Sequence, residues 1–245
     1  MKQGIYTISE NLKLAEGIYR MVLSGDSSDC TASGQFINIK LEGHYLRRPI
    51  SVCDWDDSSI TIIYKVLGRG TEEMTALPLG TELDVLTGLG NGYDLSLSGE
   101  RPLLIGGGVG IPPLYNACKK LIAEGKKPTV ILGFNSADDK FYVDEFAALG
   151  AEVVVTSADG SIGLKGFVTD AMKDLDYTYF YTCGPTAMLK AIDAIAKTSG
   201  QLSFEERMGC GFGACMGCSC ETIYGAKRIC KDGPVLRKEE ILWQI

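Results

Sequence analysis

Histidine is almost absent from this chain, and long apolar runs are missing altogether. His44 is the single histidine among the 245 residues. Zinc sites built on imidazole ligands, and Rieske iron–sulfur centres, which take two histidines, are therefore nearly excluded. No apolar run approaches the roughly 20 residues that a membrane-spanning helix needs. The sequence thus predicts no membrane span.

The chain also lacks an excess of positive charge and a secretory leader. It has 24 Lys and Arg against 31 Asp and Glu, a net charge of −7, which argues against nucleic-acid binding. Lys2, Glu10 and Arg20 interrupt the N-terminal residues, so no apolar signal core is expected. Nine cysteines without a leader predict free thiols or metal ligands instead of a disulfide framework. We therefore expect a cytoplasmic protein.

One stretch rich in cysteine and glycine, residues 206–220, dominates the rest of the sequence. Cys210, Cys215 and Cys218 have the spacing C-x4-C-x2-C, and Cys230 follows at a distance. Three close cysteines and a remote fourth form the ligand pattern of a plant-type [2Fe–2S] cluster. The interleaved glycines allow tight turns that aim backbone N–H groups at sulfur. The pattern therefore predicts a [2Fe–2S] cluster on these four thiolates.

Two alternatives at this stretch stay open. The C-x2-C spacing is also half of a structural zinc site, although zinc sites usually offer two separated pairs. A zinc-binding loop without a redox role is the corresponding alternative function. Cys220 is a fifth thiol within reach, but it follows Cys218 too closely for the remote ligand position, which Cys230 fits better.

The residues before this stretch divide into two parts with different periodicity. In residues 1–98, short alternating runs predict an antiparallel β-barrel, with strands at 4–9, 18–23, 35–41, 60–66 and 82–86. In residues 99–203, strands alternate with helices, which predicts a doubly wound parallel α/β domain. Its strands are expected at 102–106, 129–133, 152–156 and 178–182, and its helices at 112–124, 140–149, 165–173 and 185–198. Residues 204–245 form a third, small module.

Two segments of the predicted barrel have the composition of an anion site. Residues 48–51, Arg-Pro-Ile-Ser, combine a guanidinium with a hydroxyl, and such a pair can bind a phosphate. Gly68 and Gly70 precede Thr71, which we expect to be the N-cap of a helix whose free N–H groups attract anions. Taken alone, a solvated strand edge and an ordinary helix cap explain these segments at least as well.

The α/β part has two candidate cofactor turns. Residues 106–113, G-G-G-V-G-I-P-P, follow a predicted strand, and Pro112 suits the first position of a helix. The phasing is not G-x-G-x-x-G, because Ile111 stands in place of the third glycine. The position still favours a dinucleotide phosphate site over a structural turn. Residues 182–185, Thr-Cys-Gly-Pro, end another strand at the edge where ligands bind, although an isolated thiol such as Cys183 is more often simply buried.

The choice between NAD and NADP depends on the segment after the second α/β strand. Residues 134–139 include Asp138 and Asp139 and no arginine. Carboxylates at this point repel a 2′-phosphate, so the sequence favours NAD. A solvated acidic loop would have the same composition.

Taken together and in this order, these motifs resemble the ferredoxin–NADP reductase superfamily with an added [2Fe–2S] module. The resemblance is strongest to the electron transfer subunits of dihydroorotate dehydrogenase B, which end in E-R-M-x-C-G-x-G-x-C-x-x-C and then C-x-D-G-P. Residues 206–218 and 230–234 match these two motifs. The extra Cys220 and the short connection between Cys218 and Cys230 depart from the pattern.

The resemblance implies FAD, NAD and a [2Fe–2S] cluster, and it implies which residues contact the two nucleotides. FAD would lie on the barrel against Arg48, Pro49, Ile50, Ser51, Ile63, Tyr64, Lys65, Gly70 and Thr71. NAD would face the α/β domain at Gly106, Gly107, Gly108, Gly110, Cys183, Gly184 and Pro185. The resemblance also supports Cys230 as the fourth cluster ligand. No residue of the chain is expected to act as a general acid or base.

The resemblance further implies a partner, an FMN-containing catalytic subunit that oxidises dihydroorotate to orotate in pyrimidine biosynthesis. The two would form a hetero-oligomer, with a heterotetramer as the expected form. Electrons would pass from the partner's FMN through [2Fe–2S] and FAD to NAD+, because a flavin exchanges electrons both in pairs and singly. The alternative within this architecture is the small subunit of another NAD(P)H-linked complex, such as a ferredoxin-dependent transhydrogenase or a sulfide dehydrogenase.

Overall fold

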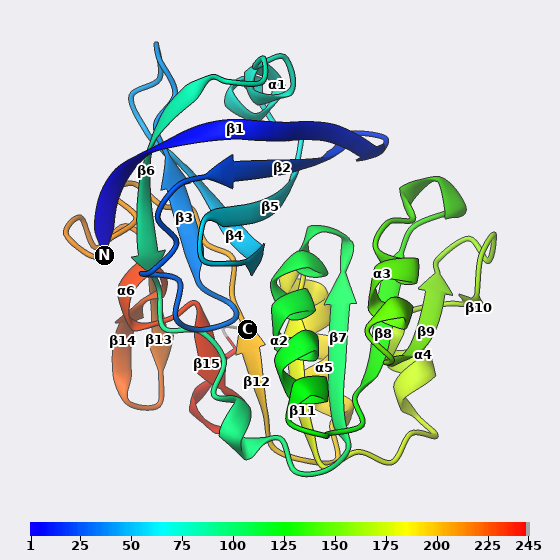
Figure 1. Ribbon diagram of the computed structural model, residues 1–245. Helices are drawn as coiled ribbons and strands as arrows, with labels where there is room; N and C mark the ends of the chain where they lie inside the picture. The colour runs from blue at the N-terminus through cyan, green and yellow to red at the C-terminus, as the bar shows by residue number, and fades with distance from the viewer. Residues whose placement is uncertain (244–245) are drawn as a thin grey trace.

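Six antiparallel strands close the N-terminal barrel in the computed structural model, which describes residues 1–243 (Figure 1). The barrel order is β1-β2-β5-β4-β3-β6. The strands are β1 (Lys2–Ala15), β2 (Ile18–Ser24), β3 (Phe36–Ile39), β4 (Arg48–Trp55), β5 (Ser59–Lys65) and β6 (Glu82–Leu89). Alternate residues such as Met21, Leu23 and Ile37 fill the interior, as the two-residue period of a strand requires. The predicted barrel is confirmed.

The helix at the end of the barrel begins differently from the prediction. Helix α1 (Arg69–Thr75) starts two residues before Thr71, with Gly68 as its N-cap. The Thr71 hydroxyl reaches back, accepts hydrogen bonds from the N–H groups of Leu67 and Gly68, and donates one to the Gly68 carbonyl. The prediction of Thr71 as the N-cap was therefore wrong by three positions, because the same hydroxyl satisfies the helix start from the third position.

The second part of the chain forms a seven-stranded sheet with the order β10-β9-β8-β7-β11-β12-β15. Its strands are β7 (Pro102–Gly107), β8 (Thr129–Phe134), β9 (Glu152–Ser157), β10 (Leu164–Lys165), β11 (Tyr179–Cys183), β12 (Gly200–Ser203) and β15 (Val235–Arg237). The chain runs outward from β7 to β10 and then returns to β11 on the other side of β7. This reversal is the topological switch at which open parallel sheets bind ligands.

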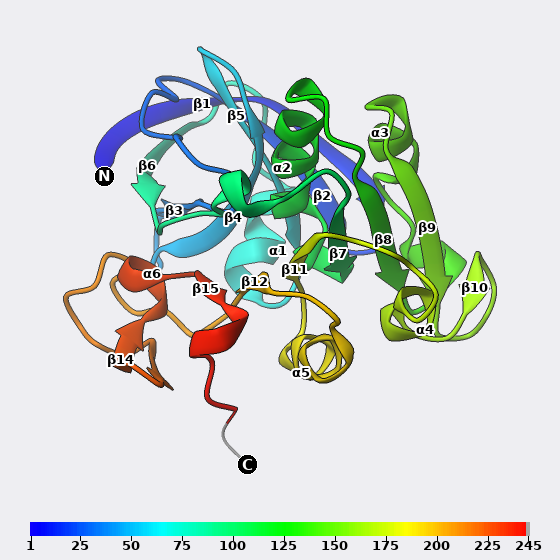
Figure 2. The ribbon, with the colours of Figure 1, turned by 90° about the horizontal axis from the view of Figure 1, so that it is seen from below.

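Helices cover both faces of this sheet (Figure 2). Helices α2 (Pro112–Ala123) and α3 (Val143–Ala148) pack on one face, and α4 (Val168–Met172) and α5 (Thr186–Ile195) on the other. The doubly wound prediction is confirmed, although two helices begin later than expected. Tyr142 has a left-handed backbone with φ of 61°, so α3 starts after it. Lys165 belongs to β10 and Gly166 has φ of 128°, so α4 starts at Val168.

The C-terminal segment is a small module below the barrel in Figure 1. It contains the hairpin β13 (Ser219–Thr222) and β14 (Gly225–Arg228), helix α6 (Ile229–Asp232) and strand β15. Short 3-10 turns are distributed along the whole chain, at Leu95–Leu97, Gly108–Gly110, Ala137–Asp139 and, within this module, Lys238–Glu240. Because β15 pairs antiparallel with β12, this segment shares a sheet with the α/β domain. The division of the chain at residues 98 and 203 stays a prediction.

Polar side chains join the barrel to the α/β domain. Asn116 of α2 accepts a hydrogen bond from the Ser33 hydroxyl at 2.7 Å and donates one to Asp54 of β4 at 2.6 Å. Lys119 reaches the other oxygen of the same carboxylate at 2.7 Å. Bonds among buried polar groups hold the two parts in one relative orientation. None of the helices within residues 1–243 combines the length and the apolar character that a membrane crossing requires.

Candidate functional site

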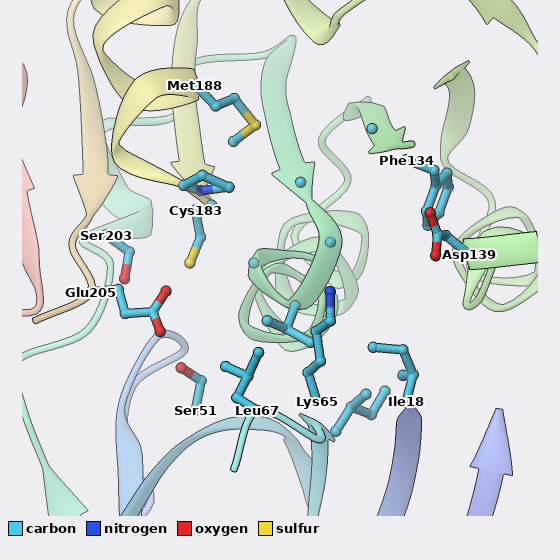
Figure 3. A pocket seen from close by; sticks show the side chains of 18 of the residues that line it. Ile18, Ser51, Lys65, Leu67, Phe134, Asp139, Cys183, Met188, Ser203 and Glu205 are labelled. Atoms are coloured by element: carbon cyan, nitrogen blue, oxygen red, sulfur yellow. The ribbon is translucent and has the colours of Figure 1, made fainter. Parts of the chain in front are cut away.

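A cavity of about 750 Å³ lies between the barrel and the α/β domain (Figure 3). Ser51, Lys65 and Leu67 reach into it from the barrel, and Cys183 and Met188 approach from the α/β side. Its volume is in the upper part of the range for cofactor and ligand sites. The cavity sits at the carboxyl ends of β7 and β11, where the strand order reverses.

The structure brings most of the predicted nucleotide-binding residues to this one cavity. The predicted residues that line it are Arg48, Pro49, Ile50, Ser51, Ile63, Tyr64, Lys65, Thr71, Gly107, Gly108, Gly110, Cys183, Gly184 and Pro185. Residues from two separately predicted domains therefore form opposite walls of a single site. Their individual contacts with FAD and NAD stay predictions.

Two predicted residues, Gly70 and Gly106, stand behind the cavity wall. A Cβ on Gly70 would lie 2.2 Å from Nε of Arg48, so this glycine makes room for the Arg48 side chain. A Cβ on Gly106 would lie 2.9 Å from Cα of Ile111, so this glycine allows the start of α2 to approach β7. Both glycines therefore make room for other atoms of the protein and not directly for a nucleotide.

Sequence reasoning missed several lining residues from other parts of the chain. They are Phe36, Phe141, Thr156, Phe167, Met188, Ser203, Glu205, Met208 and Pro234, among others. Phe134, Asn135 and Asp139 also line the cavity, and they belong to the segment predicted to decide between NAD and NADP. Ser203 and Glu205 could have been found, because they end and follow a parallel strand, but β12 itself was not predicted. Phe36 reaches the cavity because β3 pairs with β4, which places it opposite Ser51. Pro234 reaches it only because the C-terminal module packs beside the barrel.

The two consecutive arginines have different surroundings. Nη2 of Arg47 donates to both carboxylate oxygens of Asp84 at 3.0 Å, whereas Arg48 lines the cavity. Arg48 Nη2 lies 2.6 Å from Nδ1 of His44, and Nε2 of the same imidazole lies 2.6 Å from Glu73 of α1. The only histidine thus connects the cavity arginine to a carboxylate. A guanidinium held in this way at a cavity edge suits a phosphate group.

The glycine turn after β7 gives the cavity a wall of bare backbone. Gly107, Gly108 and Gly110 all line it, and a Cβ on Gly110 would lie 2.2 Å from the carbonyl oxygen of Cys183. The turn therefore packs directly against the end of β11, with no room for a side chain. At Gly108, by contrast, a Cβ would meet no protein atom within 4 Å, so the backbone there is open to the cavity. Exposed backbone just before α2 fits the pyrophosphate of a dinucleotide.

Cys183 reaches the cavity as a neutral thiol. Burial raises its pKa to about 12, against the smaller lowering effect of a hydrogen bond with Ser203. A thiol with this pKa stays protonated at neutral pH and is a weak nucleophile. The side chain can therefore contact a ring without reacting with it.

The four predicted cluster ligands come together as two pairs. The Cys210 N–H donates to Cys215 Sγ at 3.5 Å, and the Cys230 N–H donates to Cys218 Sγ at 3.4 Å. No three His, Cys, Asp or Glu side chains within residues 1–243 converge on a single metal ion. Two pairs of thiols suit a cluster of two irons, each with two protein ligands, better than one tetrahedral zinc.

The backbone of this loop favours sulfur in its charged form. The N–H groups of Phe212, Ala214 and Cys215 point at Cys210 Sγ from 3.2 to 3.5 Å. Burial raises the pKa of Cys210, but these N–H groups and a hydrogen bond with the Cys215 side chain together outweigh it and lower the pKa to about 6. Met216 adopts the left-handed region with φ of 61°, and such strain is common at functional loops. The residues present fit a [2Fe–2S] cluster.

Cys220 is held apart from the two pairs by secondary structure. It lies on β13, opposite Lys227 of β14, and burial raises its pKa. The hairpin therefore fixes this thiol in a regular strand and not in the glycine-rich loop. This placement supports Cys230 as the fourth ligand, an assignment that stays a prediction.

Comparison with known proteins agrees with the geometry. Residues 205–242 match the family described as the iron–sulfur cluster binding domain of dihydroorotate dehydrogenase B, and residues 104–194 match the oxidoreductase NAD-binding domain. A protein of Fusobacterium nucleatum named dihydroorotate dehydrogenase B (NAD(+)), electron transfer subunit, is 43% identical, with 98% of this chain and 99% of the relative covered. A protein of Bacillus pumilus with the same name is 42% identical, with 98% of each covered.

Solved structures show the same architecture. The structure of an NADH-dependent reduced ferredoxin–NADP oxidoreductase, studied for flavin-based electron bifurcation, matches with a TM-score of 0.88 and 32% identity over 98% of this chain and 90% of that one. Phthalate dioxygenase reductase matches with a TM-score of 0.66 and 16% identity, over 83% of this chain and 70% of that one, and this second likeness concerns the fold alone.

Proposed function

The chain belongs to the family of electron transfer subunits of dihydroorotate dehydrogenase B, and from this premise we propose that it carries electrons from the FMN of a catalytic subunit through [2Fe–2S] and FAD to NAD+ during dihydroorotate oxidation in pyrimidine biosynthesis. It is an NAD-linked iron–sulfur flavoprotein subunit. The observation that carries the proposal is the position of the cluster loop. Phe36 lines the nucleotide cavity and also packs in one apolar cluster with Cys218 and Cys230.

The cavity residues would bind and orient the two nucleotides. When bound, FAD supplies the exchange between paired electrons at the nicotinamide and single electrons at the cluster. Arg48 would hold a flavin phosphate, and the bare backbone at Gly108 and Gly110 would hold the pyrophosphate of NAD. Ile63 and the neutral thiol of Cys183 lie on opposite walls and would exclude water between the two rings.

The cluster loop would also be the contact site for the catalytic subunit. Cys215 is exposed, and Phe212 and Met216 beside it are 43% and 55% exposed. Apolar side chains around an exposed ligand suit a partner that must bring its own redox centre close. We place the complex in the cytoplasm, where thiols stay reduced.

The proposal predicts a brown flavoprotein that contains iron. Chain purified without oxygen should hold about one FAD, two irons and two sulfides per chain, and dithionite should give a low-temperature EPR signal of a reduced [2Fe–2S] cluster. Adding the dihydroorotate-oxidising partner should produce NADH from dihydroorotate and NAD+. A colourless chain with stoichiometric zinc would reject both the cofactors and the function.

The same cavity predicts a preference for NADH over NADPH. Asp139 lines the cavity, and its carboxylate would repel a 2′-phosphate. With an artificial acceptor, kcat/KM for NADH should exceed that for NADPH by at least about tenfold, because like charges in contact cost several kcal/mol. Asp139→Asn should narrow this ratio, and Asp138→Asn, on the exposed side of the same turn, should leave it unchanged. A wild-type preference for NADPH would contradict the assignment.

A second candidate follows from the likeness to the reduced ferredoxin–NADP oxidoreductase. The chain would then be the small subunit of a transhydrogenase and would exchange electrons with a different flavoprotein. Co-purification from the native cell distinguishes the two. A partner that carries FMN and oxidises dihydroorotate supports the first candidate, and a ferredoxin-dependent partner supports the second.

A further inference from the structure

Strand β3 joins the nucleotide cavity to the cluster module, because Phe36 both lines the cavity and packs with Cys218 and Cys230. Strand β3 pairs with β4, with Phe36 opposite Ser51 and Asn38 opposite Pro49, and both β4 residues line the cavity. Ile37 and Ile39 point into the barrel core. By the alternation of a strand, Phe36 and Asn38 therefore face outward, toward the cluster module.

Asn38 is the polar residue on this outward face, and it is bound to the cluster loop. Its side chain is 1% exposed, and its Nδ2 donates to the carbonyl oxygen of Cys210 at 3.2 Å. A carbonyl oxygen can only accept a hydrogen bond, so the Nδ2 of Asn38, and not its Oδ1, must face Cys210. The contact joins residues 172 positions apart, directly at a predicted cluster ligand.

The hydrogen bond from Asn38 to Cys210 is kept although the other polar atom of the same side chain is in an unfavourable position. Its Oδ1 is buried and has no donor within the described residues, and a buried acceptor without a donor is unfavourable. The next residue of the loop, Gly211, has φ of 77°, and a Cβ there would lie 2.3 Å from Nδ2 of Asn38. The loop therefore packs so tightly against the Asn38 amide that no side chain would fit at position 211. Violations of ordinary packing chemistry of this kind concentrate at functional positions.

We propose that Asn38 is a positioning residue for the [2Fe–2S] cluster, which ties the Cys210 end of the ligand loop to the flavin-binding barrel. The inference rests on the proposed function and extends it to the contact between the two redox centres. The amide acts on Cys210 through the backbone, so it fixes where that thiolate stands relative to the cavity wall formed by β3 and β4. It makes no contact with substrate.

The test compares two replacements of Asn38 with one control. Asn38→Asp keeps the shape but removes the N–H donor, and Asn38→Leu keeps the branching but removes both polar atoms, including the unpaired oxygen. Asn11→Asp is the matched control, because its Nδ2 also donates to a backbone carbonyl, that of Met74, at the opposite end of the barrel. Each chain is purified without oxygen with FAD bound.

Both Asn38 variants should keep their FAD and their NADH oxidation with an artificial acceptor. The rate at which a chelator removes iron should rise about 10- to 100-fold, the usual effect of losing a partner that orients a metal ligand. Reduction of the cluster by NADH in stopped-flow should slow, and the EPR spectrum of the reduced cluster should change. Asn11→Asp should match the wild type in all of these measurements.

Two results would overturn the inference. Iron loss at the wild-type rate in both variants would show that the bond does not hold the cluster. Parallel loss of FAD and iron would show that Asn38 only supports the barrel. Failure of the proposed function is recognised separately, because in that case the wild-type chain itself would lack the EPR signal.

Discussion

A Cys215→Ser chain is expected to retain FAD and to lose electron transfer to the catalytic subunit completely. Cys215 is an exposed member of the pair with Cys210, so its replacement removes a predicted cluster ligand without opening the core. Without the cluster, single electrons have no route to the partner. Oxidation of NADH by a flavin-reactive dye should continue, while the EPR signal and the NADH formed from dihydroorotate should both disappear.

Cys220→Ser is the matched control for this experiment. It removes a thiol two residues beyond Cys218 that lies on β13. Its iron content, EPR spectrum and turnover with the partner should equal those of the wild type. Loss of iron in Cys220→Ser together with its retention in Cys230→Ser would transfer the fourth ligand position to Cys220. Loss of dye reduction in Cys215→Ser would instead mean that the loop is needed for folding around metal.

An Arg48→Ala chain is expected to bind FAD about 10- to 100-fold more weakly, since hydrogen bonds to charged groups contribute about 1.5–3 kcal/mol. Arg48 is the arginine of β4 that lines the barrel side of the cavity. Its loss leaves a flavin phosphate without a charged donor. Flavin-free protein titrated with FAD, followed by the quenching of flavin fluorescence, measures the change directly.

Arg47→Ala tests whether FAD affinity depends on the position of the arginine or only on its positive charge. The side chain of Arg47 pairs with Asp84 and does not approach the cavity. The variant should melt at a lower temperature, because the pair is mostly buried, yet its FAD affinity should stay near that of the wild type. Equal loss of FAD affinity in both variants would indicate a general effect of positive charge and contradict the assignment of Arg48.

The chemistry of the cluster loop could be read from the sequence because it is local. Cys210, Cys215 and Cys218 lie within nine residues, and their spacing favours a [2Fe–2S] cluster over structural zinc. The glycine turn at residues 106–110 could be recognised from the sequence for the same reason, because its residues are consecutive. Strong alternation between strands and helices likewise gave the α/β domain, because apolar periodicity reflects burial.

The parts that escaped prediction depend on contacts between distant segments. Strands β12 and β15 are four and three residues long. They are too short to show the apolar alternation of a strand in the sequence, and they are recognised only from their pairing in the sheet. Glu205 and Pro234 reach the cavity because the chain folds back beneath the barrel. The different surroundings of Arg47 and Arg48 depend on where β4 begins, because Arg48 is its first residue and Arg47 lies just before it.

Strand β15 has a consequence for how the protein works over a catalytic cycle. By pairing with β12, it fastens the far side of the cluster module to the central sheet, while Asn38 fastens the near side to the barrel. Many carriers deliver electrons by swinging a tethered domain between donor and acceptor. Here the module is attached on both sides, so we expect the cluster to stay at one distance from the flavin during turnover, and we expect the binding and release of NAD and of the partner to be the main movements.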